Sequence, residues 1–142
     1  MRVKLSTSPL ALPAYVLALV ALYFVASLAH FGHNAEYIAI YPGMPDWLTR
    51  EKIYLAWLGV TSVGLLAFVL RRFGLHALAV LVLAAYGALG LDGLTHYTLA
   101  LCSEHTLLAN VTIWFEAVSG LSLSLTSAVL LTRRATARGR QS

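Results

Sequence analysis

Hydrophobic residues along the chain fall into four long runs separated by short polar stretches. The runs cover residues 10–30, 48–70, 75–95 and 106–131. Each run is close to the roughly 20 residues that an α-helix needs to cross the hydrocarbon core of a bilayer. The pattern therefore predicts an all-α integral membrane four-helix bundle, with a single transmembrane domain over residues 1–132 and a disordered basic tail over residues 133–142.

Charged residues divide the stretches around these runs into two kinds. The N-terminus, the middle connection and the C-terminus contain basic residues and no Asp or Glu; the basic residues are Arg2, Lys4, Arg71, Arg72, Arg133, Arg134, Arg138 and Arg140. Basic stretches beside membrane helices face the cytoplasm. We therefore expect both termini to be cytoplasmic, the other two connections to be external, and the protein to lie in a bacterial inner membrane with those connections on the periplasmic side.

The first run is also similar to a signal peptide. It follows a basic start, and Ser27 and Ala29 offer small residues where a signal peptidase could cut. Against cleavage, the run from Leu10 to Ala29 is longer than the 7–15 residues of a signal core. Retention as a membrane helix is favoured, and cleavage is the alternative.

Composition supports the membrane class and excludes others. Hydrophobic residues make up 59% of the chain and charged residues 11%, whereas a soluble domain has about 25% charged residues. The net charge of +4 comes from the flanks of apolar helices without interleaved aromatic residues, so we expect the partner to be the bilayer and not nucleic acid. The one cysteine, Cys102, cannot form an internal disulfide.

Several local patterns predict where helices begin and pack. Asp46 is a suitable N-cap for the second helix, and Ser103 for the fourth, with Glu104 in its first turn. Gly87, Gly90 and Gly93 follow one another at intervals of three. Small residues in such a stripe allow neighbouring helices to approach closely in lipid.

Histidines and acidic residues collect at the external ends of the predicted helices. His30 and His33 share one face of the first helix, and Asp92 and His96 are four residues apart on the third. A short connection brings His96 close to His105 before the fourth helix. We therefore expect these five side chains to converge.

Several imidazoles and a carboxylate at one level suit a transition metal such as Cu, Zn or Fe. The predicted metal ligands are His30, His33, Asp92, His96 and His105. Cations that take only oxygen ligands, such as Mg²⁺ and Ca²⁺, fit this set poorly. The alternative is a hydrogen-bonded polar cap that holds the first, third and fourth helices together.

The run Asp92-x3-His96-x8-His105 resembles the copper-ligand pattern of the membrane-embedded third subunit of particulate methane monooxygenase. The resemblance covers three residues, and the second spacing differs from that family's pattern. It implies copper as the metal, without assigning the chain to the family.

Glu116 lies alone within the last apolar run, about ten residues or ~15 Å from its start. A carboxylate near the bilayer midplane is costly unless it is partnered or protonated. Thr112 and Ser119 share its helix face, and His105 lies eleven residues before it. We expect Glu116 to face the bundle interior beside His105, and Glu116 and Asp92 to be the candidate catalytic acids or bases.

These observations predict a small integral membrane protein with an outward-facing His/carboxylate site that binds a transition metal and acts on a hydrophobic, lipid-like substrate. The sequence leaves open whether the protein is an enzyme. One alternative is an accessory subunit of a larger respiratory or transport complex, or of a homo-oligomer. Another is a metal-free membrane isomerase or cyclase that uses the buried acids.

Overall fold

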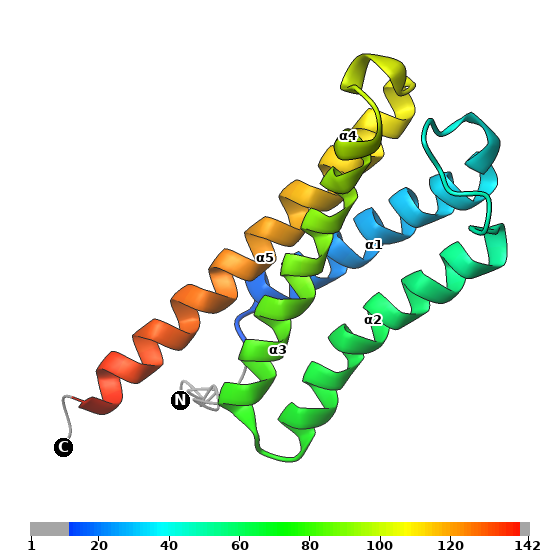
Figure 1. Ribbon diagram of the computed structural model, residues 1–142. Coiled ribbons are helices and arrows are strands. Elements are labelled where there is room, and N and C mark those ends of the chain that lie inside the picture. The colour runs from blue at the N-terminus through cyan, green and yellow to red at the C-terminus, as the bar shows by residue number, and fades with distance from the viewer. Residues whose placement is uncertain (1–11, 140–142) are drawn as a thin grey trace, which may run out of the picture.

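The chain folds as a bundle of long helices (Figure 1). The computed structural model describes residues 12–139, with helices α1 (Ala14–Glu36), η1 (Ile38–Ile40), α2 (Arg50–Arg72), α3 (His76–Ala88), η2 (Leu89–Thr95), α4 (His96–Leu99), η3 (Cys102–Glu104) and α5 (Leu107–Gly139). Four segments are long and apolar enough to cross a membrane: Ala14–Glu36, Arg50–Arg72, His76–Leu99 and Leu107–Arg133. The predicted all-helical fold is confirmed, and the described residues contain four segments with the length and composition of membrane spans.

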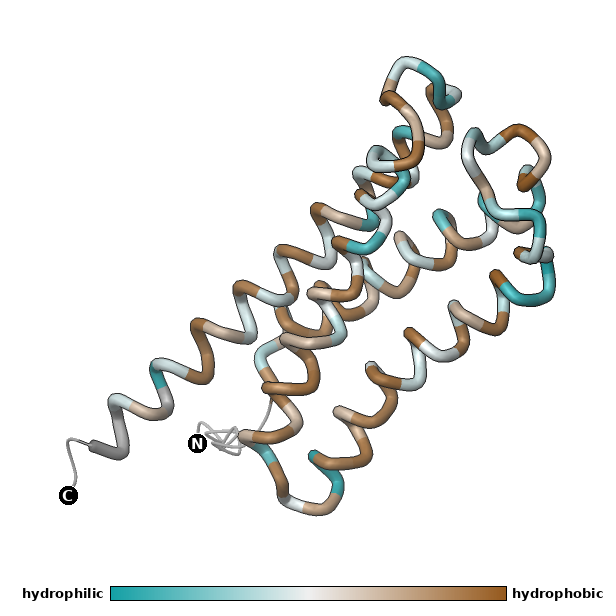
Figure 2. Tube along the Cα trace, in the orientation of Figure 1, coloured by the Kyte–Doolittle hydropathy of each residue, from teal (hydrophilic) through white to brown (hydrophobic). Residues whose placement is uncertain are grey.

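The four spans alternate in direction (Figure 1). The α1–α2 and α4–α5 connections lie at one end of the bundle, here called the histidine end, and the α2–α3 turn lies at the other. Helix α5 packs against α1 and α3, and α2 packs against the same two helices from the other side. Figure 2 shows hydrophobic residues along most of each span and hydrophilic ones concentrated at the histidine end.

The core is built from aromatic and aliphatic side chains of α1, α3 and α5. Tyr23 and Tyr86 are fully buried and meet edge to face with ring centroids 4.6 Å apart. Leu83 and Leu123 complete this layer. Because lipid supplies little hydrophobic drive between helices, such close packing contributes much of the association of the spans.

The third span changes from an α-helix to a 3₁₀ helix at Leu89 and resumes as α4 at His96. A 3₁₀ helix has three residues per turn, so residues three apart are eclipsed. Gly90, Gly93 and His96 are accordingly all buried. A Cβ at Gly90 would lie 3.0 Å from the carbonyl oxygen of Glu116, so the glycines let this segment approach α5 closely.

This change of helix type overturns one prediction. Asp92 and His96 would share a face in an α-helix, but at three residues per turn they point about 120° apart. Asp92 is exposed, whereas His96 is buried. The predicted shared α-helical face is therefore not formed, although both residues border the same cavity.

The predicted caps were also wrong. The second helix begins three residues later than an Asp46 cap requires, because residues 45–48 form a turn in which Leu48 N–H donates to Pro45 O. Thr49 is the N-cap, and its hydroxyl accepts from Lys52 N–H at 3.4 Å.

At the start of α5, Thr106 replaces the predicted cap Ser103. Its hydroxyl accepts from Ala109 N–H at 3.1 Å. Glu104 lies outside the helix and instead accepts from Leu101 N–H at 2.6 Å. The connection therefore has a 3₁₀ turn of its own before α5 begins.

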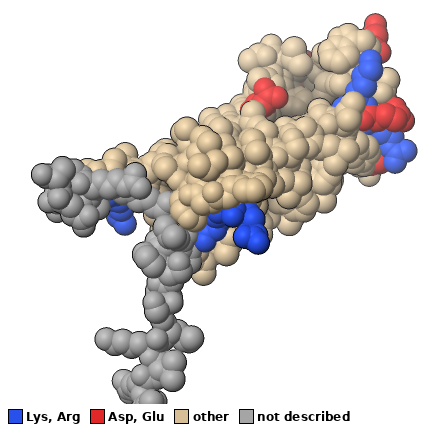
Figure 3. Space-filling model, turned by 90° about the horizontal axis from the view of Figure 1, so that it is seen from below, with Lys and Arg blue, Asp and Glu red and all other residues tan. Residues whose placement is uncertain are grey.

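Helix α5 is longer than its apolar run and continues to Gly139. The tail predicted over residues 133–142 is therefore helical in its described part, since Arg and Ala are good helix formers. Of the basic residues used for topology, Arg2, Lys4 and Arg140 lie outside the described residues. Figure 3 shows the red acidic side chains toward the histidine end, whereas the blue ones near the opposite end have no red neighbour.

Candidate functional site

Four buried polar side chains from three parts of the fold meet near the histidine end. His30 and Asn34 come from α1, His96 begins α4, and Glu116 comes from α5. Their exposed fractions are 2%, 6%, 8% and 1%, respectively. We call these four residues the buried polar cluster.

Asn34 connects the two histidines of the cluster. Its amide nitrogen donates to His30 Nε2 at 3.2 Å and to His96 Nε2 at 3.1 Å. Each imidazole therefore presents an unprotonated Nε2, and the two ring centroids are 5.2 Å apart. Asn34 is four residues after His30, which predicts the same helix face, but its amide was not among the predicted site residues.

Glu116 is the carboxyl group of the cluster. Its Oε2 lies 3.6 Å from His30 Nε2, which is longer than a hydrogen bond of about 2.7–3.2 Å. Its 1% exposure confirms the predicted interior orientation. Gly93 makes room for it, because a Cβ there would lie 3.1 Å from Oε2. Among the side chains that the structure describes, no Lys or Arg pairs with Glu116.

Five buried polar atoms in this region have no hydrogen-bond partner in the protein: His30 Nδ1, Asn34 Oδ1, His96 Nδ1, His105 Nε2 and Glu116 Oε2. Leaving a buried polar atom unpaired costs about 1–3 kcal/mol, and most such atoms in proteins are paired. Their concentration in one region is typical of a site that binds polar groups.

A cavity of about 360 Å³ lies beside the cluster. Its polar lining consists of the four cluster residues together with Asp92 and Thr95. The rest of the lining is mostly apolar and includes Met44, Pro45, Trp47, Leu48, Ile53 and Ala56 from the α1–α2 connection and the start of α2. This volume lies within the 300–1,000 Å³ of small-molecule sites, which combine an apolar lining with a few polar groups.

Tyr41 separates His33 from the other histidines. Its hydroxyl and His33 Nδ1 are hydrogen-bonded at 2.6 Å. Its ring centroid lies 5.3 Å from that of His96 and 6.1 Å from that of His105. Burial raises the pKa of Tyr41 to about 12, while a hydrogen bond with Thr112 opposes the shift, so the side chain is a neutral phenol at pH 7.

The predicted ligand set is only partly brought together. His30 and His96 are in the cluster, and the His105 ring centroid lies 6.0 Å from that of His96. His105 Nδ1 donates to Leu101 O at 3.0 Å. Asp92 borders the cavity, but its carboxylate makes no hydrogen bond or ion pair with any described residue. Glu116, and not Asp92, is the carboxyl group beside a histidine.

Glu36 belongs to a separate contact between α1 and α2. Its Oε1 accepts from Arg50 Nη2 and Tyr54 OH, both at 2.7 Å. Both members of the Glu36–Arg50 pair are largely exposed. This contact fastens the histidine ends of the two helices and contributes no group to the cavity.

The residues described do not include three or more His, Cys, Asp or Glu side chains placed together to hold a metal ion. The reason is local: His30 and His96 direct Nε2 toward an amide, and Asp92 is exposed. Metal binding therefore stays a prediction.

Comparison of the chain with protein-family models, with curated proteins and with solved structures finds no match. The function must accordingly be inferred from the chemistry of the cluster and its cavity.

Proposed function

We propose that this protein binds a hydrophobic or amphiphilic small molecule from the bilayer, and that Glu116 and His30 exchange a proton with its polar group. One observation carries the proposal: a carboxyl group and an imidazole, both almost fully buried and 3.6 Å apart, line a cavity whose remaining lining is mostly apolar. An isolated acid at this depth is costly, and in membrane proteins such acids mark functional sites.

The chemistry that suits this pair is general acid–base catalysis. Glu116 serves as the proton donor and His30 Nε2 as the acceptor, so a substrate gains a proton at one atom and loses one at another. The exchange balances without an oxidant or reductant, as in an isomerisation or cyclisation. Asn34 and His96 orient the His30 ring. After turnover His30 holds the proton that Glu116 has lost, and their separation of 3.6 Å is short enough for a small movement to return it.

Transition-metal binding is the second candidate, and the 3.6 Å separation of His30 Nε2 and Glu116 Oε2 favours it as well. Two ligands of a tetrahedral ion with bonds of 2.0–2.2 Å lie about 3.4 Å apart, close to the separation of His30 Nε2 and Glu116 Oε2. His30, His96 and Glu116 would be ligands to Cu, Zn or Fe once the Asn34 amide withdraws from Nε2. Further ligands from the predicted set would require movement of His33, Asp92 or His105.

Analysis of detergent-purified protein separates the two candidates. We expect mass spectrometry of an organic extract to find a hydrophobic compound bound to the wild type, and at least tenfold less bound to His30→Ala. Elemental analysis should find less than about one-tenth of a metal ion per chain. The matched control is His76→Ala, because His76 starts α3 at the opposite end of the bundle.

Equal amounts of extracted compound in all three proteins would contradict the proposal. One equivalent of Cu, Zn or Fe that is lost in His30→Ala and kept in His76→Ala would establish the second candidate instead.

We propose that the histidine end faces the periplasm and that both termini are cytoplasmic. The described residues at the opposite end include Arg71, Arg72 and Arg133 and no acidic residue, which supports this orientation. A membrane-impermeant maleimide applied to intact cells should label the exposed Cys102. In a Cys102→Ser background it should label Asp46→Cys and leave His76→Cys unlabelled until the cells are opened. Labelling only His76→Cys would reverse the orientation.

A further inference from the structure

A second cavity lies nearer the middle of α1 and α2, away from the buried polar cluster, and opens on the outer surface of these helices, where Leu17 and Leu65 are exposed. Its volume is about 270 Å³, and it lies between residues 17–24 of α1, residues 61–68 of α2 and Tyr86 of α3. Its lining is apolar apart from the hydroxyls of Thr61 and Tyr86. The proton chemistry proposed above uses none of these residues.

The two cavities follow the same seam between three helices. The cavity at the cluster is lined by His30, Phe31 and Asn34 of α1, by Ile53 and Ala56 of α2, and by Leu89 and Gly93 of η2. The second cavity takes the next stretches of α1 and α2, and Tyr86 precedes Leu89 by one turn. The α1 residues that line the two cavities are centred near positions 32 and 20. Twelve residues of α-helix span about 18 Å, so this is the distance between the two cavities along α1.

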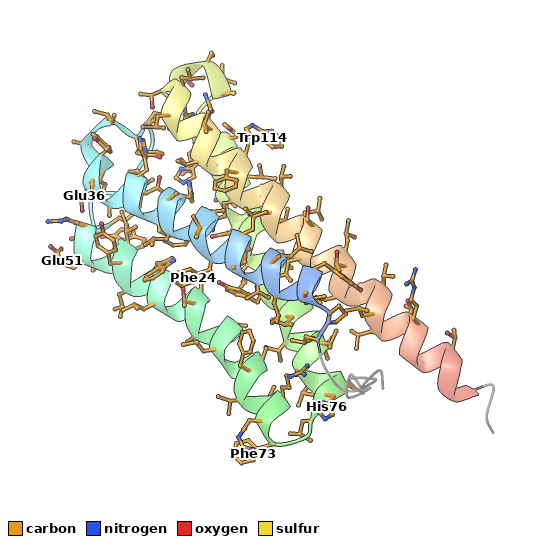
Figure 4. The ribbon with its side chains drawn as sticks, turned by 180° about the vertical axis from the view of Figure 1, so that it is seen from behind. Phe24, Glu36, Glu51, Phe73, His76 and Trp114 are labelled. Carbon is orange, nitrogen blue, oxygen red and sulfur yellow. The ribbon has the colours of Figure 1, made fainter. Side chains whose placement is uncertain are left out.

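A pair of aromatic side chains separates the two cavities. Phe24 of α1 and Trp57 of α2 have ring centroids 5.6 Å apart, and Figure 4 shows Phe24 between these helices. Trp57 Nε1 donates to Ser27 Oγ at 3.3 Å. Trp57 is half-buried and lines neither cavity, so a chain that joins the two cavities would displace its ring and break its hydrogen bond to Ser27.

Gly64 shapes the second cavity. A Cβ at this position would lie 2.8 Å from Tyr86 Cε1, so only glycine lets the Tyr86 ring form the floor of the cavity. The exposed Ala21 and the half-buried Thr61 form part of its sides with small side chains. The second cavity is therefore a narrow apolar groove, here called the groove, which lies on the same seam as the buried polar cluster.

We infer that the ligand of the buried polar cluster carries a linear hydrocarbon chain of about 14 carbons, which passes Trp57 and occupies the second cavity. This inference rests on the proposed function. C–C bonds of about 1.5 Å advance an extended zigzag chain by about 1.25 Å each, so the ~18 Å along α1 corresponds to about 14 carbons. Polar chemistry at one end and an apolar groove along the seam fit a single-chain amphiphile.

The groove selects chain length more than it adds affinity. Lipid tails are as apolar as the lining of the groove, so moving a chain from the bilayer into it gains little free energy. Filling the groove, by contrast, makes a long chain clash and leaves a short one unaffected. The measurable consequence is therefore a ratio between long and short chains.

The test compares binding of 1-hexadecanol and 1-octanol to the protein in lipid nanodiscs at equal mole fraction, measured by native mass spectrometry. Ala21→Trp fills the groove from α1. We expect it to lower the hexadecanol-to-octanol binding ratio at least tenfold while octanol binding is kept. The matched control is Ala18→Trp, because Ala18 is also exposed on α1 but lines neither cavity.

The outcomes separate this inference from the proposed function. If Glu116→Gln removes octanol binding and Ala21→Trp leaves the ratio equal to that of Ala18→Trp, the groove holds no chain and only this inference fails. If the wild type binds neither alcohol, both fail. Should Ala21→Trp not fold, Thr61→Trp fills the groove from α2, with the exposed Ser62→Trp as its control.

Discussion

Glu116→Gln is expected to abolish the proton-transfer function and to lower ligand retention at least tenfold, while the free energy of unfolding stays within about 0.5 kcal/mol of the wild type. Gln keeps the volume of the side chain and a hydrogen-bond donor but has no proton to exchange. Glu116 Oε2 has no hydrogen bond in the protein, so the change removes no hydrogen bond at this atom and alters only its 3.6 Å approach to His30 Nε2. Retention is measured by mass spectrometry of the purified protein and stability by unfolding in mixed micelles.

Glu116→Leu extends this prediction to stability. Removing a buried polar group that lacks partners relieves a cost of about 1–3 kcal/mol, so we expect the Leu variant to be at least as stable as the wild type and inactive. Gain of stability with loss of function is typical of functional sites. The control is Glu36→Gln, which alters the exposed contact to Arg50 and should leave ligand retention unchanged.

The opposite pattern would support a hydrogen-bonded polar cap. In that case Glu116→Gln would be silent in every assay, and Glu116→Leu would destabilise the bundle. Glu116 would then hold helices together without taking part in proton exchange.

Gly120→Ala is expected to lower the free energy of unfolding by about 1–3 kcal/mol, the range for overpacking. A Cβ at Gly120 would lie 2.5 Å from Gly87 O and 3.1 Å from Gly90 Cα. Both neighbours are backbone atoms of the third span, so relief requires that α5 and this span move apart. Unfolding in mixed micelles measures the loss.

Gly59→Ala is the matched control for this prediction. No atom lies within 4 Å of a Cβ built at Gly59 in α2. Ala is the better helix former by about 0.8–1.0 kcal/mol, so this variant should be slightly more stable than the wild type. A Gly120→Ala variant as stable as Gly59→Ala would show that α5 and the third span do not meet through these glycines.

The same close approach affects the site. Glu116 is one turn before Gly120 on α5, and Gly93 is one 3₁₀ turn after Gly90. Separation of the two segments would therefore draw Glu116 away from His30. We expect Gly120→Ala to lose ligand retention along with stability, which is the reason to assess the site with Glu116→Gln and not with glycine variants.

The sequence by itself determined the four spans and the interior position of Glu116. A bilayer requires about 20 apolar residues for each helix, so a local property of the chain defines the spans. It also makes a lipid-facing carboxyl group costly, so a single acid in an apolar helix must turn inward. Both conclusions follow from the apolar environment of the bilayer core, and neither requires knowledge of which helices are neighbours.

Only the tertiary structure decided which polar groups meet. The change to a 3₁₀ helix at Leu89 turns His96 inward and leaves Asp92 exposed, because close packing of Gly90 and Gly93 on α5 outweighs the α-helical pattern. The α1–α2 connection folds back and inserts Tyr41 beside His33. Asn34 meets His96 only because α1 and α4 are neighbours in space, 62 residues apart in sequence. Helical periodicity reports the face of one helix and carries no information about the residue that an adjacent helix brings to it.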